Sequence, residues 1–183
     1  ACGPVTGQLF IGDHARSAVF RVVLAKVDGY YQGCAINFVD HLQSGVVRSR
    51  FAADGSLWVG QTGRGWRSRG NAMFGLERII WDGQTVPFAI HSVKLTPDGF
   101  KVCFTQPADR TQALRESSYV IQRWQYKYHP DYGSPKVGHT PDTIKAIKLS
   151  ADGMTAQLTM PTQVGSMYRF KITVASTSGA TPS

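Results

Sequence analysis

The sequence predicts an all-β, antiparallel protein. Asp-Gly pairs at 54–55, 98–99 and 152–153 each separate two runs rich in apolar and β-branched residues, a pattern typical of β-hairpins. The same dipeptide favours type I′ turns, whose two central residues both need positive φ. Helix signals are almost absent: only residues 108–118 have the composition for one or two helical turns, with Asp109 as the N-cap. We therefore expect strands throughout, joined by hairpins at these three pairs.

The strands before residue 85 follow from short apolar or alternating runs. Strand candidates are 8–11, 18–25, 30–38, 46–51, 56–61 and a second apolar run that ends at Trp81. In the run 46–51 simple alternation puts Val46, Arg48 and Arg50 on one face. A turn-rich stretch then runs from Trp81 to Pro87 and is the best candidate for a domain boundary. We expect a first domain over 1–85.

After this boundary the chain has turn signals at the spacing of a β-sandwich. Seven strand candidates are 88–96, 100–105, 119–128, 137–139, 143–149, 154–160 and 168–174. The run 119–128 alternates over its whole length, so we expect it to be long and central. The sandwich domain is predicted over 86–175, and the linker-like composition of 176–183 predicts a flexible tail.

Composition limits the function classes. The 183 residues carry a net charge of +8, with 42% apolar and 17% charged residues, which suits an ordinary globular core. No run approaches the roughly 18 apolar residues that a membrane-spanning helix needs. The charge favours an acidic partner such as a glycan, or no dedicated partner at all. The cations are dispersed except for Arg64, Arg67 and Arg69, so no specific nucleic-acid partner is predicted.

The three cysteines, Cys2, Cys34 and Cys103, form no CxxC pair and have no closely spaced histidine partners, which excludes a short-spacing zinc motif. One disulfide between Cys2 and Cys34 is a candidate that the sequence leaves open. Cys103 lies in the middle of a predicted strand, where a buried free thiol is the usual state.

Several segments resemble a known protein family. They are GQLFIGDHARSAVFRV, YYQGCAINF, SGVVRSRFAADGSLWVGQTGRGW, FGLERIIWDGQTVPFAIHSVKLTPDGFKVCFT and YKYHPDYGSP. Together they are similar to the C-terminal region of secreted bacterial glucose/sorbosone-dehydrogenase-like proteins, in which a β-propeller precedes a small β-sandwich, often with cytochrome c domains on the same chain. The resemblance covers residues 7–175 and implies a secreted or periplasmic location.

For the fold, the resemblance implies partial propeller-like antiparallel sheets followed by an immunoglobulin- or fibronectin-like β-sandwich. A blade of four strands takes about 40–45 residues, so residues 1–85 have room for about two blades and no closed ring. The chain is then either the terminal part of a longer protein, or its open edges are covered by self-association or by contact with further blades.

For the chemistry, the resemblance implies a catalytic histidine, pyrroloquinoline quinone and calcium in earlier blades. This chain has no matching motif, so no cofactor and no catalytic residue are assigned to it. We expect a non-catalytic structural and binding portion of a sugar-dehydrogenase-like protein, with carbohydrate as the candidate ligand. The alternative is a quinone- or metal-dependent sugar oxidoreductase whose catalytic blades come from a longer parent or another chain.

The sharpest candidate binding site is the stretch Gly63–Gly70, which contains Arg64, Trp66, Arg67 and Arg69. Arginines bind carboxylate or phosphate in a bidentate manner, and an indole stacks on a ring. The spacing does not fit a dinucleotide fingerprint. The competing interpretation is a long flexible hairpin loop with solvated arginines.

A second candidate is Asp13 with His14, in a turn beside the first strand, where a histidine can act as a base or a metal ligand; a capped turn is the competing interpretation. A third is the aromatic row Tyr119, Trp124, Tyr126, Tyr128 and Tyr132, which favours either a carbohydrate platform or, as is more common on a sandwich strand, a packed interior.

Overall fold

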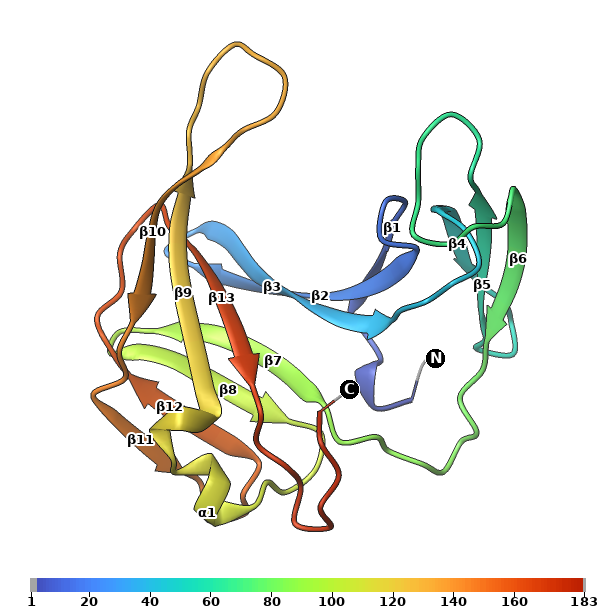
Figure 1. Ribbon diagram of the computed structural model, residues 1–183. Helices are drawn as coiled ribbons and strands as arrows, with labels where there is room; N and C mark the ends of the chain where they lie inside the picture. Colours follow the sequence, from blue (N-terminus) through green and yellow to red (C-terminus); the bar gives the residue numbers. More distant parts are fainter. Residues whose placement is uncertain (1–2, 183) are drawn as a thin grey trace. The chain divides into compact units, whose positions relative to one another are not determined.

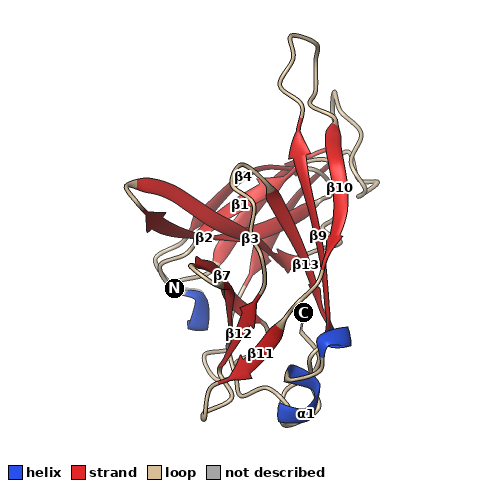
Figure 2. Ribbon diagram, turned by 90° about the vertical axis from the view of Figure 1, so that its left-hand side faces the viewer, coloured by secondary structure: helices blue, strands red, loops and turns tan. Residues whose placement is uncertain are grey.

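A computed structural model describes residues 3–182 and divides the chain into two compact units, one up to Pro87 and one from Phe88. Nearly all regular structure is antiparallel strand, with only short helical turns (Figures 1 and 2). The all-β prediction is therefore confirmed. Within residues 3–182 no helix is both long and apolar enough to cross a bilayer.

The N-terminal unit contains two three-stranded sheets. The first has the order β1-β2-β3 and the second the order β4-β5-β6. Their strands are β1 (Leu9–Asp13), β2 (Ala18–Val27), β3 (Tyr30–Val39), β4 (Val46–Phe51), β5 (Leu57–Thr62) and β6 (Phe74–Ile79), preceded by a 3₁₀ turn at Gly3–Val5. Each sheet thus has one strand fewer than the four of a propeller blade.

The two sheets of this unit share one small core. Its buried members come from both sheets and from the segments around them: Val5, Val19, Leu42, Val46, Leu57 and Val59. β1 approaches β4 closely at Gly12, where a Cβ atom would overlap the side chain of Val46. Glycine at this position therefore allows the two sheets to pack together.

The expected alternation in β4 is wrong at its first residue. A register shift between Val46 and Arg48 marks a β-bulge opposite β5. Because a bulge inserts one extra residue, Val46 is buried at 5% exposure while Val47, Arg48 and Arg50 are exposed. Val46 and the two arginines therefore do not share a face.

The Asp-Gly hairpins exist, but their predicted turn type is wrong. Gly55, Gly99 and Gly153 have positive φ, whereas the aspartate before each of them does not. The pair with positive φ at both residues is Asp28-Gly29, at 49° and 87°, between the paired residues Val27 and Tyr30. This two-residue loop has the conformation of a type I′ turn.

The C-terminal unit contains two sheets around one core. One has the order β11-β12-β8-β7 and the other the order β10-β9-β13. The strands are β7 (Ile90–Thr96), β8 (Gly99–Phe104), β9 (Tyr119–Tyr126), β10 (Lys136–Asp142), β11 (Ala146–Leu149), β12 (Thr155–Thr159) and β13 (Met167–Ile172). All seven predicted strands are present, and β9 is central in its sheet, as expected.

Both sheets contribute to the core of this unit. Phe100 and Val102 of β8 and Leu158 of β12 face Ile121 of β9 and Ile172 of β13 in a single buried cluster. This is the arrangement of a β-sandwich, in which inward residues of two sheets interdigitate.

The one predicted helical segment is confirmed as α1 (Arg110–Ala113), followed by a 3₁₀ turn at Glu116–Ser118. Asp109 is the N-cap, and its Oδ1 accepts a hydrogen bond of 2.8 Å from the amide of Gln112. The hydroxyl of Tyr119 donates to the carbonyl oxygen of Ala113 at 2.8 Å, and burial raises the pKa of this phenol to about 12.

The segment 176–180, expected to be part of a flexible tail, is held against the sandwich. Ser176 is buried and forms a bridge with Ala108, and the amide of Thr177 donates to the carbonyl of Pro107 at 3.0 Å. Of the cysteines, Cys103 is a half-buried free thiol in β8. Cys2, one member of the candidate pair Cys2–Cys34, lies outside the described residues.

Candidate functional site

The stretch Gly63–Gly70, which we call the Arg/Trp loop, connects β5 to β6 and lies on the N-terminal unit (Figure 1). Its start is closed by a hydrogen bond of 2.9 Å from the amide of Gly63 to the carbonyl of Met73. The hydroxyl of Thr62 then accepts from the amide of Arg64 at 3.1 Å. The loop therefore begins with a fixed neck.

The end of the loop is fixed to two other segments. The amide of Arg69 donates to the carbonyl of Ala15 at 3.0 Å, and the amide of Gly70 donates to the hydroxyl of Ser17 at 2.9 Å. Just beyond the loop, the amide of Ala72 donates to the carbonyl of Gln43 at 3.0 Å. These three bonds anchor the base of the loop.

These bonds also join the two candidate groups predicted separately from the sequence. Asp13 is the last residue of β1 and His14 begins the β1–β2 turn, and this turn contributes Ala15 and Ser17 to the anchors. The β1–β2 turn, with Asp13 at its edge, and the Arg/Trp loop are thus directly hydrogen-bonded, and together they contain the six predicted site residues, Asp13, His14, Arg64, Trp66, Arg67 and Arg69.

At the end of β1, Asp13 has a local role in the turn that follows. Its Oδ1 accepts from the amide of Arg16 at 2.9 Å, and its Oδ2 lies 3.9 Å from Nε of the same arginine. His14 is half-buried, and a Cβ atom at Gly45 would stand 2.6 Å from its ring. The imidazole therefore packs against the backbone of Gly45, and the capped-turn interpretation describes this pair.

The side chains of the Arg/Trp loop point to solvent. Trp66 is 72% exposed, and Arg64, Arg67 and Arg69 are all exposed. No ion pair joins any of these three arginines to a carboxylate within residues 3–182. Three unpaired guanidinium groups and an accessible indole can bind an anionic ring compound through charge-assisted hydrogen bonds and stacking.

A partly buried polar network that supports the loop was not predicted from the sequence; Ser44 and Gln61 are its buried members. Glu77 Oε2 accepts from the amide of Gln43 at 3.0 Å and from Nε2 of Gln61 at 2.6 Å. Gln61 Oε1 in turn accepts from the amide of Ser44 at 2.7 Å, and Ser44 Oγ donates to the carbonyl of Ala72 at 2.7 Å. The network holds the 43–44 segment, which holds the loop.

One signal for this network was present in the sequence. Gln61 follows Leu57 and Val59 at a spacing of two, so alternation alone places a polar side chain on the buried face of β5. A buried polar group requires a partner. Which residues become the partners of Gln61 depends on the tertiary fold, and no sequence pattern predicts them.

The aromatic row of the C-terminal unit does not form one platform. Trp124 is buried, with Nζ of Lys136 4.0 Å from its ring centre and His139 stacked on it at 5.6 Å. Tyr128 and Tyr132 are fully exposed but lie beyond the end of β9. The packed interpretation therefore holds for Trp124.

Among the described residues, no group of three or more His, Cys, Asp or Glu side chains comes together as a possible metal site. Comparison of the chain with protein-family models, with curated proteins and with solved structures gave no match.

Proposed function

We propose that the protein is a non-catalytic binding portion of a secreted or periplasmic sugar-dehydrogenase-like propeller protein, and that it binds acidic carbohydrate through the Arg/Trp loop. The sequence resemblance supports the first part. The second part depends on one observation, namely three unpaired arginines beside an exposed tryptophan on a loop with an anchored base.

The anchored base favours binding because less conformational entropy is lost when a ligand is held. The guanidinium groups would pair with carboxylate or sulfate groups in a bidentate manner, and Trp66 would cover the apolar face of a sugar ring. The neck of the loop adds apolar surface, since Met73 and Phe74 are 72% and 77% exposed.

Binding to polygalacturonate, measured by isothermal titration, tests the proposal. The triple change Arg64→Ala, Arg67→Ala and Arg69→Ala should weaken binding about tenfold, given that an exposed ion pair contributes roughly 0.2–1 kcal/mol. Trp66→Ala should also weaken binding. The affinity lost in this variant should depend little on salt concentration, whereas the affinity contributed by the arginines should fall steeply as salt is added.

A matched control removes the same number of charges from the C-terminal unit, by Lys94→Ala, Lys101→Ala and Lys148→Ala, which are all exposed positions. This control should retain the affinity. If the two triple variants lost the same affinity for polygalacturonate, the effect would come from net charge alone. If neutral dextran bound as tightly as polygalacturonate, recognition of acid groups would be ruled out.

A further inference from the structure

The C-terminal sandwich has an immunoglobulin-like strand order with one position vacant. In that fold one sheet has the order A-B-E-D and the other contains C, F and G. The sheet β7-β8-β12-β11 follows the first order, and β9 and β13 take the places of C and F. The seventh strand is β10, which pairs with β9 on the opposite side from β13. Within residues 3–182, no strand takes the position of strand G beside β13.

The edge at β13 differs from the other three sheet edges of this unit. β10 carries a register shift and contains Gly138 and Pro141, β7 has a register shift near Ile90, and β11 is four residues long. Such features blunt an edge against pairing. β13 is six residues long, contains neither glycine nor proline, and pairs with β9 in unbroken register.

The backbone groups on this edge can be assigned from one hydrogen bond. The amide of Thr173 donates to the carbonyl of Ser118 at 3.0 Å, and this pair continues the register of β13 with β9. Hydrogen-bonded pairs alternate along an antiparallel ladder. Tyr168, Phe170 and Ile172 therefore direct their amide and carbonyl groups away from β9, toward the vacant position.

The segment after β13 leaves this edge open. Residues 175–177 turn to residues 107–109, where the amide of Asp109 donates to the carbonyl of Ala175 at 2.8 Å. The chain then reverses, with a hydrogen bond of 2.7 Å from the amide of Ser176 to the carbonyl of Ala180. None of these bonds involves the free edge.

The side chains at the edge define what would pair there. On the inner face, Tyr168 and Phe170 are only half-buried, with their rings 4.9 Å and 5.0 Å from that of Phe100. On the outer face, Arg169 and Lys171 are exposed, and no carboxylate within residues 3–182 pairs with either. An incoming strand would bury apolar residues beside the first pair and place acidic residues beside the second.

We propose that the free edge of β13 binds an extended peptide strand from another protein, in which apolar residues alternate with acidic ones. The strand pairs with β13 in antiparallel orientation and adds to the sheet β10-β9-β13. A second copy of β13 is disfavoured as the occupant, because it would place Arg169 and Lys171 beside like charges.

The test uses the full chain and a fluorescein-labelled seven-residue peptide in which valine alternates with glutamate. Fluorescence anisotropy should show saturable binding, and amide hydrogen exchange should slow at Tyr168, Phe170 and Ile172. The valine residues lie opposite these three, and opposed residues of this kind exchange both backbone hydrogen bonds. N-methylation of the valines should therefore abolish binding, whereas N-methylation of the glutamates should leave it nearly unchanged.

Charge reversal provides the second readout. The double change Arg169→Glu and Lys171→Glu should weaken binding of the glutamate peptide about tenfold and should favour a peptide with lysine in place of glutamate. Lys94→Glu and Lys101→Glu is the matched control, since these exposed lysines lie directly opposite each other on β7 and β8. Circular dichroism checks the fold of each variant.

Three results would overturn the proposal. The first is the absence of saturable binding in the intact protein, and the second is equal loss from the two N-methylation patterns. The third is a concentration-dependent dimer that protects the same three amides, which would assign the edge to self-pairing instead.

Discussion

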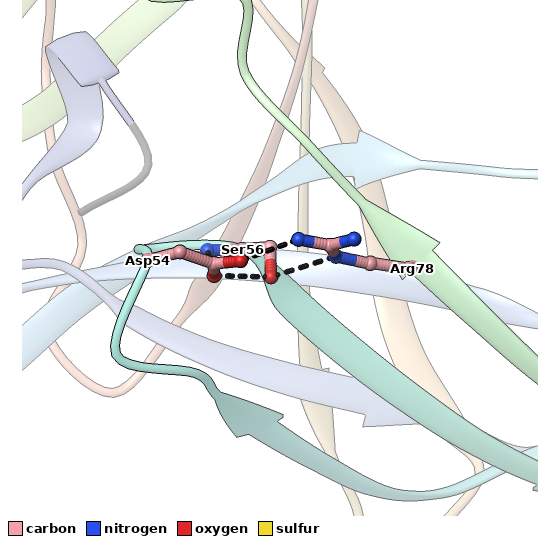
Figure 3. A network of polar contacts seen from close by, with 3 residues as sticks. All are labelled: Asp54, Ser56 and Arg78. Carbon is pink, nitrogen blue, oxygen red and sulfur yellow. Dashed lines mark hydrogen bonds and ion pairs between the residues drawn. The ribbon is translucent and has the colours of Figure 1, made fainter.

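At the scale of single residues, the hydrogen bonds around Asp54 show how one turn is fixed (Figure 3). Asp54 Oδ1 accepts from the amide and from the hydroxyl of Ser56, at 2.9 Å and 2.6 Å. Arg78 pairs with Asp54 Oδ2, and its Nε donates to Ser56 Oγ at 3.0 Å. The arginine lies on β6 and the turn joins β4 to β5, so this small cluster ties all three strands at one end of their sheet.

These contacts predict the titration of Asp54. The hydrogen bonds from Ser56, and then the charge of Arg78, lower the pKa of this carboxyl group to about 2. Carboxyl carbon shifts followed by NMR across pH 1–6 would measure it. Ser56→Ala should raise the pKa of Asp54, because it removes the hydroxyl hydrogen bond, which is the largest single cause of the lowered value, and leaves the amide hydrogen bond in place. An unchanged pKa in this variant would contradict the assignment.

The sign of the linked stability follows from the lowered pKa. Folding favours the charged form of Asp54, so this group contributes to stability above the ordinary aspartate pKa of about 4. The contribution is lost as the pH falls from that value through about 2. In Ser56→Ala this acid-dependent part of the unfolding free energy should shrink.

At the scale of elements, the Arg/Trp loop depends on close backbone contact at Gly70. A Cβ atom at Gly70 would overlap the carbonyl group of Gln43, which is backbone and has no rotamer to change. Gly70→Ala should therefore lower the free energy of unfolding of the N-terminal unit by roughly 1–3 kcal/mol. Hydrogen exchange at the amide of Arg69 should become faster, because its bond to Ala15 lies next to the displaced residue.

Gly60→Ala is the matched control for this prediction. Gly60 lies in β5, where the nearest atom to an added Cβ would be 3.8 Å away. The change should leave the unfolding free energy the same or raise it slightly. Both variants can be compared by urea denaturation with tryptophan fluorescence. A loss in Gly60→Ala as large as that in Gly70→Ala would point to strand propensity instead of the backbone overlap.

The strands were predictable because each depends on local periodicity, whereas turn types and loop anchors depend on partners. Asp28-Gly29 forms the two-residue turn because Val27 pairs with Tyr30. Around Asp54-Gly55 the flanking pair is Phe51 with Leu57, which leaves a longer loop. The dipeptide is the same in both places, so strand register decides the turn type.

The candidate site was predictable in its composition but not in its geometry. Arg64, Trp66, Arg67 and Arg69 stand out as a cluster within one loop, and each is exposed as a binding residue must be. Their support comes from Ser17, whose hydroxyl accepts from the amide of Gly70, 53 positions later in the chain. A single serine in a turn has no sequence signal for such a long-range role.

At the scale of the whole molecule, each unit has its own core. The cluster around Val102 and Leu158 lies wholly after residue 87, and the cluster around Leu57 and Val59 lies wholly before it. The sequence placed the boundary at 85/86, within the same turn-rich stretch. Units with separate cores are expected to unfold as separate cooperative steps.

The two cores give a prediction for how the chain unfolds. Leu158 and Leu57 are both fully buried, at 0% and 1% exposure, so replacing either by alanine should cost about 2–5 kcal/mol. Leu158→Ala should lower only the transition reported by amide exchange in β8, β9 and β12. Leu57→Ala should lower only the transition reported by β2, β4 and β5.

A fragment of residues 88–183 should keep the amide NMR shifts that its core residues have in the intact chain. Separate cores share no buried residue, so a cavity in one should not weaken the other. The two cores would instead form one cooperative unit if either substitution lowered both transitions equally, or if the fragment lost its dispersed spectrum.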